Sequence, residues 1–352
     1  MSDQTRRRKV DHISICLKQD VECKNVTTGL EYVHILHNAL PEMDLEDVNT
    51  SSNIFGYKIS FPLIFDSITG GSKESKGINK NIAEVAKEKN LPIFLGSIRP
   101  ALEDPDLLDS YTVARDVAPE TFIGLNIGAS QLSRGIDIDK LKSFISNIKA
   151  NALSIHLNPL QESIQVEGEP FFRSVLEKIR FLSKNLGVPI VVKEVGCGIS
   201  REVASKLELA GVSAINVAGL GGTNWATVES LRAKMLGNSG KAELGALFST
   251  WGIPTAVSII ECAQTVKVPV IASGGIRSGL DMAKALVLGA KYCSIALPVL
   301  RTSKSISQLS SLVDRFLMEF KVAMFLAGCR SVEELKSVRY YMDYPLRSWI
   351  MR

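Results

Sequence analysis

The feature that most constrains the fold is an eightfold alternation of short apolar runs and helical segments, which begins near residue 60. The runs are apolar on both faces: FPLIFD (61–66), LPIFLG (91–96), TFIGLN (121–126), ALSIHL (152–157), VPIVVK (188–193), SAINVA (213–218), VPVIAS (268–273) and KYCSIA (291–296). Such runs are typical of parallel strands that are buried on both sides. Eight of them, each with a crossover helix, predict an α/β fold, the (β/α)8 TIM barrel.

The segments between these strands have helical periodicity. In DMAKALVLGA (281–290) the apolar side chains fall on one stripe, and Gly289 is placed to end the helix. REVASKLELAG (201–211) repeats this pattern and also closes with glycine. An open doubly wound sheet is the alternative architecture, but it favours a GxGxxG motif after the first strand, and this chain has none there.

The barrel accounts for the middle of the chain. We expect residues 1–60 to form an N-terminal extension, residues 61–300 the (β/α)8 barrel with the functional site, and residues 301–352 a C-terminal helical tail packed on the barrel. The connection 218–253 is unusually long, which favours an active-site loop over a plain linker.

Composition excludes several classes of protein. With 45% hydrophobic and 22% charged residues, the chain is neither disordered nor fibrous. No apolar run approaches the ~20 residues of a membrane helix, and no apolar segment follows the basic N-terminus as in a secretory signal. The six cysteines form no CxxC pair, so we expect reduced thiols in a cytoplasmic protein. A net charge of +4 is too small to indicate nucleic-acid binding by itself.

Polar and glycine-rich residues follow all eight predicted strands. In a TIM barrel the C-terminal ends of the strands form the active-site face. Turns collect glycine and polar residues for structural reasons alone. A functional site is favoured because all eight ends carry them, and because Asn126, His156 and Lys193 interrupt or border apolar strands.

Two glycine-rich segments suggest an anion site. SGGIRSG (273–279) places bare backbone N–H groups before a helix, with Ser278 as the expected N-cap. Barrels often bind phosphate at the corner after strands seven and eight. GLGGT (219–223) follows strand six and could add Thr223 to the same phosphate. A tight glycine turn without a ligand is the alternative.

The segment HLNPLQE (156–162) gathers polar side chains where a strand ends. Asn158 suits an N-cap and Pro159 the first position of a short helix, which places Asn158, Gln161 and Glu162 on one face. A carboxylate with two amides and an imidazole suits a Mg²⁺-bound polyphosphate. A capped, hydrogen-bonded loop is the alternative.

Two groups of basic residues have competing interpretations. Lys193, at the end of its strand, needs an anionic partner, either a ligand or a carboxylate such as Glu194. The run RRRK (6–9) is by default a solvated tail, but it could also bind nucleic acid or close over the barrel as an anion clamp.

In order along the chain, the motifs resemble those of type 2 isopentenyl-diphosphate isomerases, a family of FMN-dependent barrel enzymes. They are RKVDH (8–12), ITGG (68–71), GSIR (96–99), NIGA (126–129), HLNPLQE (156–162), VVKEVGCG (191–198), AGLGGTNW (218–225), WGIPT (251–255) and SGGIRSGLDMAKALVLGA (273–290). They span nearly the whole chain. HLNPLQE is the most specific, whereas SGGIR alone fits many flavin barrels.

The resemblance implies interconversion of isopentenyl and dimethylallyl diphosphate by a 1,3-allylic proton shift on reduced FMN, with Mg²⁺, and with NADPH as reductant. It implies FMN binding by Ser67, Ile68, Thr69, Ser97, Asn126, Lys193, Thr223, Gly275, Ile276, Arg277, Ala296 and Leu297. It implies substrate binding by Arg8, Lys9, Arg99, His156, Asn158 and Gln161, and Mg²⁺ binding by Glu162. It assigns catalysis to Gln161, His156 and Lys193, in a homo-oligomer (tetramer or octamer) without nucleic-acid or membrane partners.

Four positions depart from the pattern of that family. Ile68 stands where Met is common, Ile98 replaces a Gln, Asn216 stands where Asp is common, and VEGE (166–169) replaces PEGD. None of these removes an expected ligand, and Ile98 and Asn216 bear on the shape of the pocket.

Two other classes of function predict different features. A 2-hydroxy-acid oxidase needs a base such as a His after strand six, but the segment there, NVAGLGGTNW, contains no His. An IMP-dehydrogenase-like enzyme needs a nucleophilic Cys in a loop at the C-terminal end of the barrel, but residues 218–253 contain no Cys. A basic RNA-binding protein would lack bound flavin and its yellow colour.

Overall fold

The computed structural model describes residues 3–350, with only the backbone for residues 3–6. Eight parallel strands close into a barrel: β4 (Leu63–Phe65), β5 (Ile93–Ser97), β6 (Ile123–Gly128), β7 (Ala152–His156), β8 (Ile190–Lys193), β9 (Ala214–Asn216), β10 (Val270–Ala272) and β11 (Tyr292–Ile295). β11 pairs with β4 to complete the ring. Every predicted strand is present, and the predicted barrel is confirmed.

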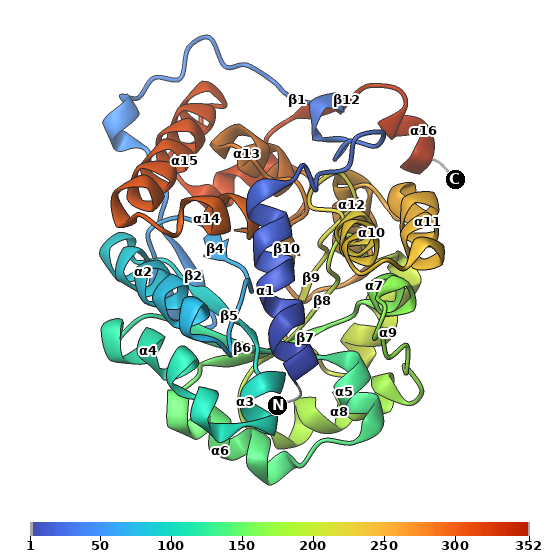
Figure 1. Cartoon of the computed structure of the whole chain (residues 1–352). Helices are drawn as coiled ribbons and strands as arrows, with labels where there is room; N and C mark the ends of the chain where they lie inside the picture. Colours follow the sequence, from blue (N-terminus) through green and yellow to red (C-terminus); the bar gives the residue numbers. More distant parts are fainter. Residues whose placement is uncertain (1–2, 351–352) are drawn as a thin grey trace.

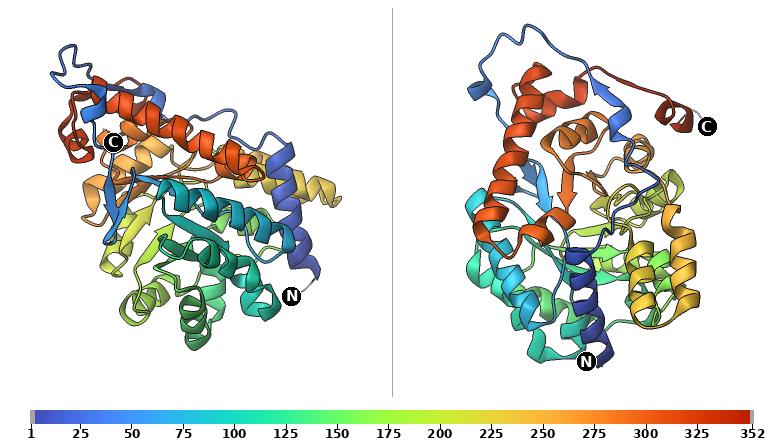
Figure 2. Two further views of the ribbon diagram at one scale, coloured as in Figure 1. Left: turned by 90° about the vertical axis from the view of Figure 1, so that its left-hand side faces the viewer. Right: turned by 45° about the horizontal axis from the view of Figure 1, so that its top comes forward.

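Long helices surround the strands (Figure 1): α2 (Lys73–Lys89), α4 (Asp109–Val117), α6 (Ile138–Ile148), α8 (Val175–Asn185), α9 (Arg201–Leu209), α12 (Thr255–Thr265), α13 (Gly279–Val287) and α15 (Ile306–Leu326). The expected caps are present, because the Ser278 hydroxyl accepts a hydrogen bond from the N–H of Asp281 and Gly289 has a φ of 111°. α15 packs against α2 and α13 along the outside of the barrel, as Figure 2 shows.

Further helices lie around the C-terminal ends of the strands: α3 (Arg99–Glu103), α5 (Ala129–Arg134), α7 (Pro159–Ile164), α10 (Trp225–Met235), α11 (Ser239–Leu247) and α14 (Leu297–Thr302), with the turns η3 (Pro105–Leu107) and η4 (Phe248–Thr250). The expectation that residues 218–253 form a loop is therefore wrong. They contain two helices, α10 and α11, which pack against each other.

The basic N-terminal run belongs to helix α1 (Asp3–Lys18), which lies across the open end of the barrel in Figure 1 and packs on α10 and α14. The default expectation of a solvated tail is wrong for Arg8 and Lys9, because both side chains are partly buried there.

The segments at the two ends of the chain meet in a small sheet. Strand β1 (Val33–Ile35) pairs antiparallel with β12 (Tyr340–Met342), close to α16 (Leu346–Ile350), and the turns η1 (Leu30–Tyr32), η2 (Leu45–Asp47) and η5 (Val332–Ser337) complete this region. The domain boundaries at 60 and 300 stay a prediction. Within residues 3–350, no helix has the length and hydrophobicity needed to cross a lipid bilayer.

A β-hairpin closes the N-terminal end of the barrel. It consists of β2 (Ser52–Ile54) and β3 (Tyr57–Ile59). Phe55 and Gly56, with φ of 46° and 92°, make the two-residue turn, a geometry that matches the twist of the paired strands. The Tyr57 ring packs edge-on against Phe122, and the Tyr292 hydroxyl donates a hydrogen bond of 2.5 Å to the Asn53 carbonyl.

The interior of the barrel is divided into two layers by the two-residue period of the strands. The lower layer faces the hairpin and is apolar: Ile64, Phe94, Gly124, Ala152, Val191, Ala214, Ile271 and Tyr292. The upper layer, two residues further along each strand, is polar or glycine: Asp66, Gly96, Asn126, Ser154, Lys193, Asn216, Ser273 and Ser294. The upper layer forms the base of the site described next.

Candidate active site

A cavity of about 240 Å³ opens above the upper layer. A water molecule takes about 30 Å³, so this space fits a much larger ligand. Of the predicted site residues, the wall contains Arg8, Lys9, Ser67, Ile68, Thr69, Ser97, Arg99, Asn126, His156, Asn158, Gln161, Glu162, Lys193, Thr223, Gly275, Arg277, Ala296 and Leu297. Only Ile276 is outside the wall, because its side chain is 1% exposed and packs in the core.

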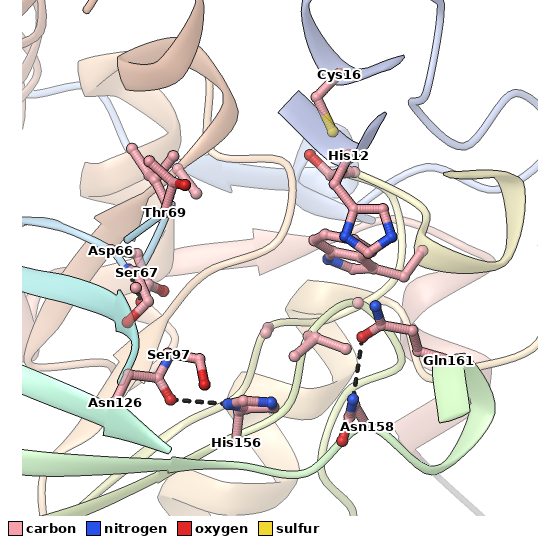
Figure 3. Close-up of a pocket in the computed structure, with 18 of the residues that line it drawn as sticks. His12, Cys16, Asp66, Ser67, Thr69, Ser97, Asn126, His156, Asn158 and Gln161 are labelled. Atoms are coloured by element: carbon pink, nitrogen blue, oxygen red, sulfur yellow. Dashed lines mark hydrogen bonds between the residues drawn. The ribbon is translucent and has the colours of Figure 1, made fainter. Parts of the chain in front are cut away.

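His156 is held in a defined tautomer. Its Nδ1 lies 2.8 Å from the Asn126 Oδ1, which can only accept, so Nδ1 carries the proton and Nε2 keeps a lone pair (Figure 3). Burial, and then the charges of Lys193 and Lys9, lower the pKa of His156 to about 3. The imidazole is therefore neutral at physiological pH and offers an acceptor rather than an acid.

The polar face of α7 forms as expected, with one correction. The Asn158 Nδ2 donates to the Gln161 Oε1 at 3.1 Å and to the Glu162 Oε1 at 3.0 Å. The sequence position of Asn158 predicted an N-cap, but its Oδ1 accepts no N–H of α7, because the side chain is held by the bonds of its Nδ2 to Gln161 and Glu162. Its Oδ1 is buried and has no hydrogen-bond partner among the described residues.

Three basic side chains meet on one side of the cavity. The Lys9 Nζ donates to the carbonyls of Gly70 and Ser97, at 2.5 and 3.2 Å. Burial and the charge of Arg8 lower the pKa of Lys9 to about 7. Arg99 binds Glu103 and Glu169 at 2.8 and 3.1 Å, so an anionic ligand would have to compete with these carboxylates for it.

The carboxylate beside Lys193 is not Glu194, which the sequence offered as an alternative to a ligand, but Asp66. The Lys193 Nζ lies 3.6 Å from the Asp66 Oδ2. Glu194 instead turns back on its own loop, where its Oε2 accepts the N–H groups of Val195, Gly196 and Cys197 at 2.5 to 2.6 Å. Although those bonds favour the carboxylate, burial raises the pKa of Glu194 to about 7.

The two predicted glycine segments come together in the wall of the same cavity. A Cβ on Gly222 would lie 2.2 Å from the Gly275 nitrogen, and a Cβ on Gly275 would lie 2.3 Å from the Thr28 methyl, so only glycine fits at either position. Gly275 also has a φ of 79°. The Arg277 guanidinium is bound by the Glu22 carboxylate.

This cradle fits the phosphate of a cofactor such as FMN. Within residues 3–350, no acceptor bonds the N–H groups of Gly275 and Ile276. Polar backbone groups of this kind bind anions at the start of a helix, here α13. The Ser67 hydroxyl in the cavity wall is also buried without a partner among the described residues. These groups could hold FMN.

The α7 side of the cavity fits a divalent cation. Glu162 is 7% exposed, and the free Oδ1 of Asn158 lies beside it. Both are hard oxygen donors, which Mg²⁺ prefers, and Mg²⁺ commonly takes one or two protein carboxylates together with phosphate and water oxygens. Among the described residues, no three His, Cys, Asp or Glu side chains group as metal ligands.

Sequence reasoning missed a buried charged group beside α7. The Glu229 side chain, 1% exposed, accepts the Gln161 amide at 3.0 Å and lies 2.9 Å from the His12 Nε2. Burial opposes ionisation, but His12, Gln161 and Arg232 together lower the pKa of Glu229. The spacing of His12 three residues after Lys9 could have indicated His12 once α1 was known, whereas nothing in its local sequence marks Glu229.

Solved structures of a flavocytochrome b2 and of mandelate oxidase share this fold. The chain superposes on a flavocytochrome b2 variant with a TM-score of 0.68 at 20% identity, covering 92% of this chain and 81% of that one. A mandelate oxidase variant gives 0.64 at 17% identity, covering 97% and 99%. Identities this low establish the common fold only.

Sequence comparisons are more specific. Residues 160–341 match the family model of FMN-dependent dehydrogenases. The isopentenyl-diphosphate delta-isomerase of Archaeoglobus fulgidus is 44% identical, covering 98% of each chain, and that of Pyrococcus abyssi is 40% identical, covering 100% of this chain and 96% of its own. The relative of the same name from Halobacterium salinarum is 42% identical, covering 99% and 97%. With this identity over its full length and the family's motifs gathered around one cavity, the chain belongs to the FMN-dependent isopentenyl-diphosphate delta-isomerase family.

Proposed function

We propose that this enzyme interconverts isopentenyl diphosphate and dimethylallyl diphosphate by a 1,3-allylic proton shift on reduced FMN with Mg²⁺. The observation that carries the proposal is the identity of 40–44% over nearly the whole chain to isomerases of that name. The cavity supports it, since basic groups suited to a diphosphate and a glycine cradle suited to a cofactor phosphate line the same space.

The diphosphate is bound by the basic side of the cavity. Arg8, Lys9 and Arg99 supply charge-assisted hydrogen bonds, and Asn158 and Gln161 supply neutral ones. The neutral His156 offers its Nε2 as an acceptor toward the ligand, such as a protonated or water-bridged phosphate oxygen. These contacts fix the position of the short alkene, which has no polar group of its own to orient it.

Glu162 would hold the Mg²⁺ that bridges to the diphosphate. Its carboxylate is oriented by Asn158 and by the backbone N–H of Glu169, at 3.0 and 2.8 Å. A ligand fixed by such partners keeps its geometry when the metal binds.

Moving a double bond by one carbon requires proton addition at one end of the allylic unit and removal at the other. Bound in the cradle, reduced FMN would supply negative charge and a proton-exchanging nitrogen beside the alkene. Lys193 at the base of the cavity contributes positive charge there, and α1 covers the opening against water. Gln161, bonded to Glu229, is placed to position or relay a proton.

The reaction has no net redox change. We therefore propose NADPH as a reductant that primes the flavin and is not consumed at each turnover. We further propose a cytoplasmic homo-oligomer, a tetramer or octamer, that binds neither nucleic acid nor membrane.

The test is an anaerobic assay with FMN, dithionite and Mg²⁺, in which conversion of isopentenyl diphosphate is followed by NMR. We expect turnover only with reduced flavin and Mg²⁺ present. Mandelate and lactate under air serve as the comparison, with oxygen uptake as the readout. Oxidation of a hydroxy acid without any isomerisation would overturn the proposal.

A further inference from the structure

A buried network in the upper layer links Asp66 to Lys193. The Asp66 Oδ2 accepts the Asn216 Nδ2 at 3.0 Å and the Ser294 hydroxyl at 2.9 Å, and it lies 3.6 Å from the Lys193 Nζ. The Asp66 Oδ1 accepts the N–H of Ser67 at 2.7 Å. The carboxylate is therefore fixed from strands β4, β9 and β11 while it faces the lysine on β8.

The orientation of Asn216 makes this arrangement directional. Its Oδ1 accepts the Ser273 hydroxyl, and the Ser273 oxygen in turn accepts the N–H of Ala218 at 3.0 Å. With its oxygen occupied in this way, Asn216 can present only its N–H₂ group to Asp66. Asp66 is therefore surrounded by hydrogen-bond donors and accepts bonds through both of its oxygens.

The charges of this pair are almost fully removed from water. Asp66 is 6% exposed and Lys193 is 7% exposed. A buried ammonium group needs an anion nearby, and within residues 3–350 Asp66 is the carboxylate within 4 Å of the Lys193 Nζ. Both residues line the cavity, so a ligand placed above them competes for the same charge.

We infer that Asp66 is a positioning residue that acts through Lys193, holding its ammonium group at the base of the cavity and sharing its charge with the bound flavin. The inference rests on the proposed function only in that FMN occupies this cavity. Reduction adds negative charge to the flavin, which then shares Lys193 with Asp66. Asp66 therefore opposes reduction and Lys193 favours it, so the two residues together set the reduction potential.

The test compares the flavin midpoint potentials of Asp66→Asn, Lys193→Gln and the double variant, each as the FMN-loaded protein, in an anaerobic dye-coupled titration. We expect Asp66→Asn to raise the potential and Lys193→Gln to lower it, each by about tenfold in the reduction equilibrium, or ~30 mV for two electrons. The double variant should lie near the unmodified protein. Ser294→Ala is the matched control, because it removes a hydrogen bond from the same carboxylate oxygen without changing charge, and its shift should be much smaller.

A swapped variant, Asp66→Asn with Asn216→Asp, moves the negative charge within the same network from the end of β4 to β9, where residue 216 pairs with Lys193 on β8. We expect a potential close to that of the unmodified protein. If Asp66→Asn does not retain FMN, the swapped variant decides alone, and any clear shift of its potential overturns the inference. Asp66→Asn with an unchanged potential, or one lowered as in Lys193→Gln, also overturns it.

The two proposals can fail separately. A protein that binds FMN and shows these shifts but forms no dimethylallyl diphosphate would refute the isomerase activity and leave the role of Asp66 intact. If the protein isomerises but Asp66→Asn leaves the potential unchanged, the role of Asp66 is refuted and the isomerase activity stands. Absence of FMN binding in the unmodified protein would refute both.

Discussion

The lower and upper layers of the barrel interior are two residues apart on the same strands, and they differ in polarity and in their contribution to stability. The lower layer is apolar and closes against the hairpin through rings such as Phe94 and Phe122, which pack 6.0 Å apart. Each buried side chain of this size contributes about 1.5–3 kcal/mol. The upper layer carries a buried ion pair and amides, which give little stability and serve the cavity.

The difference shows how one set of short strands can provide both a stable core and a chemical site. Strands β8 and β9 change from Val191 and Ala214 below to Lys193 and Asn216 above. Buried polar groups are tolerated only when they are bonded. The network around Asp66 meets this requirement within the layer, and the Ser67 hydroxyl, which has no partner among the described residues, lines the cavity. Variants in the two layers should therefore separate function from stability.

The largest expected effect is on activity, at Glu162 in the cavity wall. Glu162→Gln removes the carboxylate proposed to hold Mg²⁺, and we expect turnover to fall about 10²–10³-fold, or ~3–4 kcal/mol of transition-state stabilisation. Thermal unfolding of the ligand-free protein should barely change. Glu177→Gln, an exposed carboxylate on α8, is the control. A Glu162→Gln protein with normal turnover and normal Mg²⁺ dependence would contradict the assignment.

Glu194 sharpens the comparison. It directly follows β8 at the C-terminal end of the barrel, but we expect it to affect stability. Burial raises its pKa from 4.5 to about 7, so the folded protein binds a proton that the unfolded chain has lost between these values. Its contribution to stability is fully present below pH 4.5 and is lost as the pH rises to about 7, by up to ~3 kcal/mol. The Glu194→Gln variant should lose this slope in urea unfolding measured from pH 4.5 to 8. If the unfolding free energy depends on pH identically in the two proteins, Glu194 does not contribute this pH dependence.

A smaller effect is expected at Lys9, whose pKa is lowered to about 7 by burial and by Arg8. Binding of a diphosphate should restore the proton, so affinity should fall above pH 7 by up to about tenfold for each pH unit. Calorimetric titration of inorganic pyrophosphate into the protein and into Lys9→Arg gives the matched comparison. The titration of pyrophosphate itself is common to both, so a pH dependence that is equal in the two proteins would exclude proton uptake by Lys9.

The barrel could be predicted from the sequence because its signal is repeated eight times. Each strand has its own apolar run, and the polar residues after the strands must meet at one end once the sheet closes. For this reason Asn126, His156 and Lys193, which are distant in sequence, were correctly expected to share one cavity.

The failures concern residues whose partners come from distant segments. Glu229 lies on α10, and its partner His12 lies on α1. The basic run in α1, residues 6–9, was by default expected to be a solvated tail. For Lys193 the sequence left open a ligand or a carboxylate such as the adjacent Glu194. A strand neighbour points to the other face, whereas Asp66, which the sequence did not indicate, faces the lysine across the barrel. Local sequence contains no information on such contacts.

The most direct test of the contrast between the cavity and the lower layer is a paired measurement of FMN affinity and unfolding free energy on Ser67→Ala and Phe94→Leu. Ser67→Ala should weaken FMN binding about threefold to tenfold by removing one hydrogen bond to the ligand, and should change the unfolding free energy by less than about 1 kcal/mol, because the Ser67 hydroxyl has no hydrogen-bond partner among the described residues. Phe94→Leu should lower the unfolding free energy by about 1–2 kcal/mol and leave FMN affinity within about twofold. The reverse pattern, or equal losses of both quantities in both variants, would contradict the division of the barrel into a stabilising layer and a functional cavity.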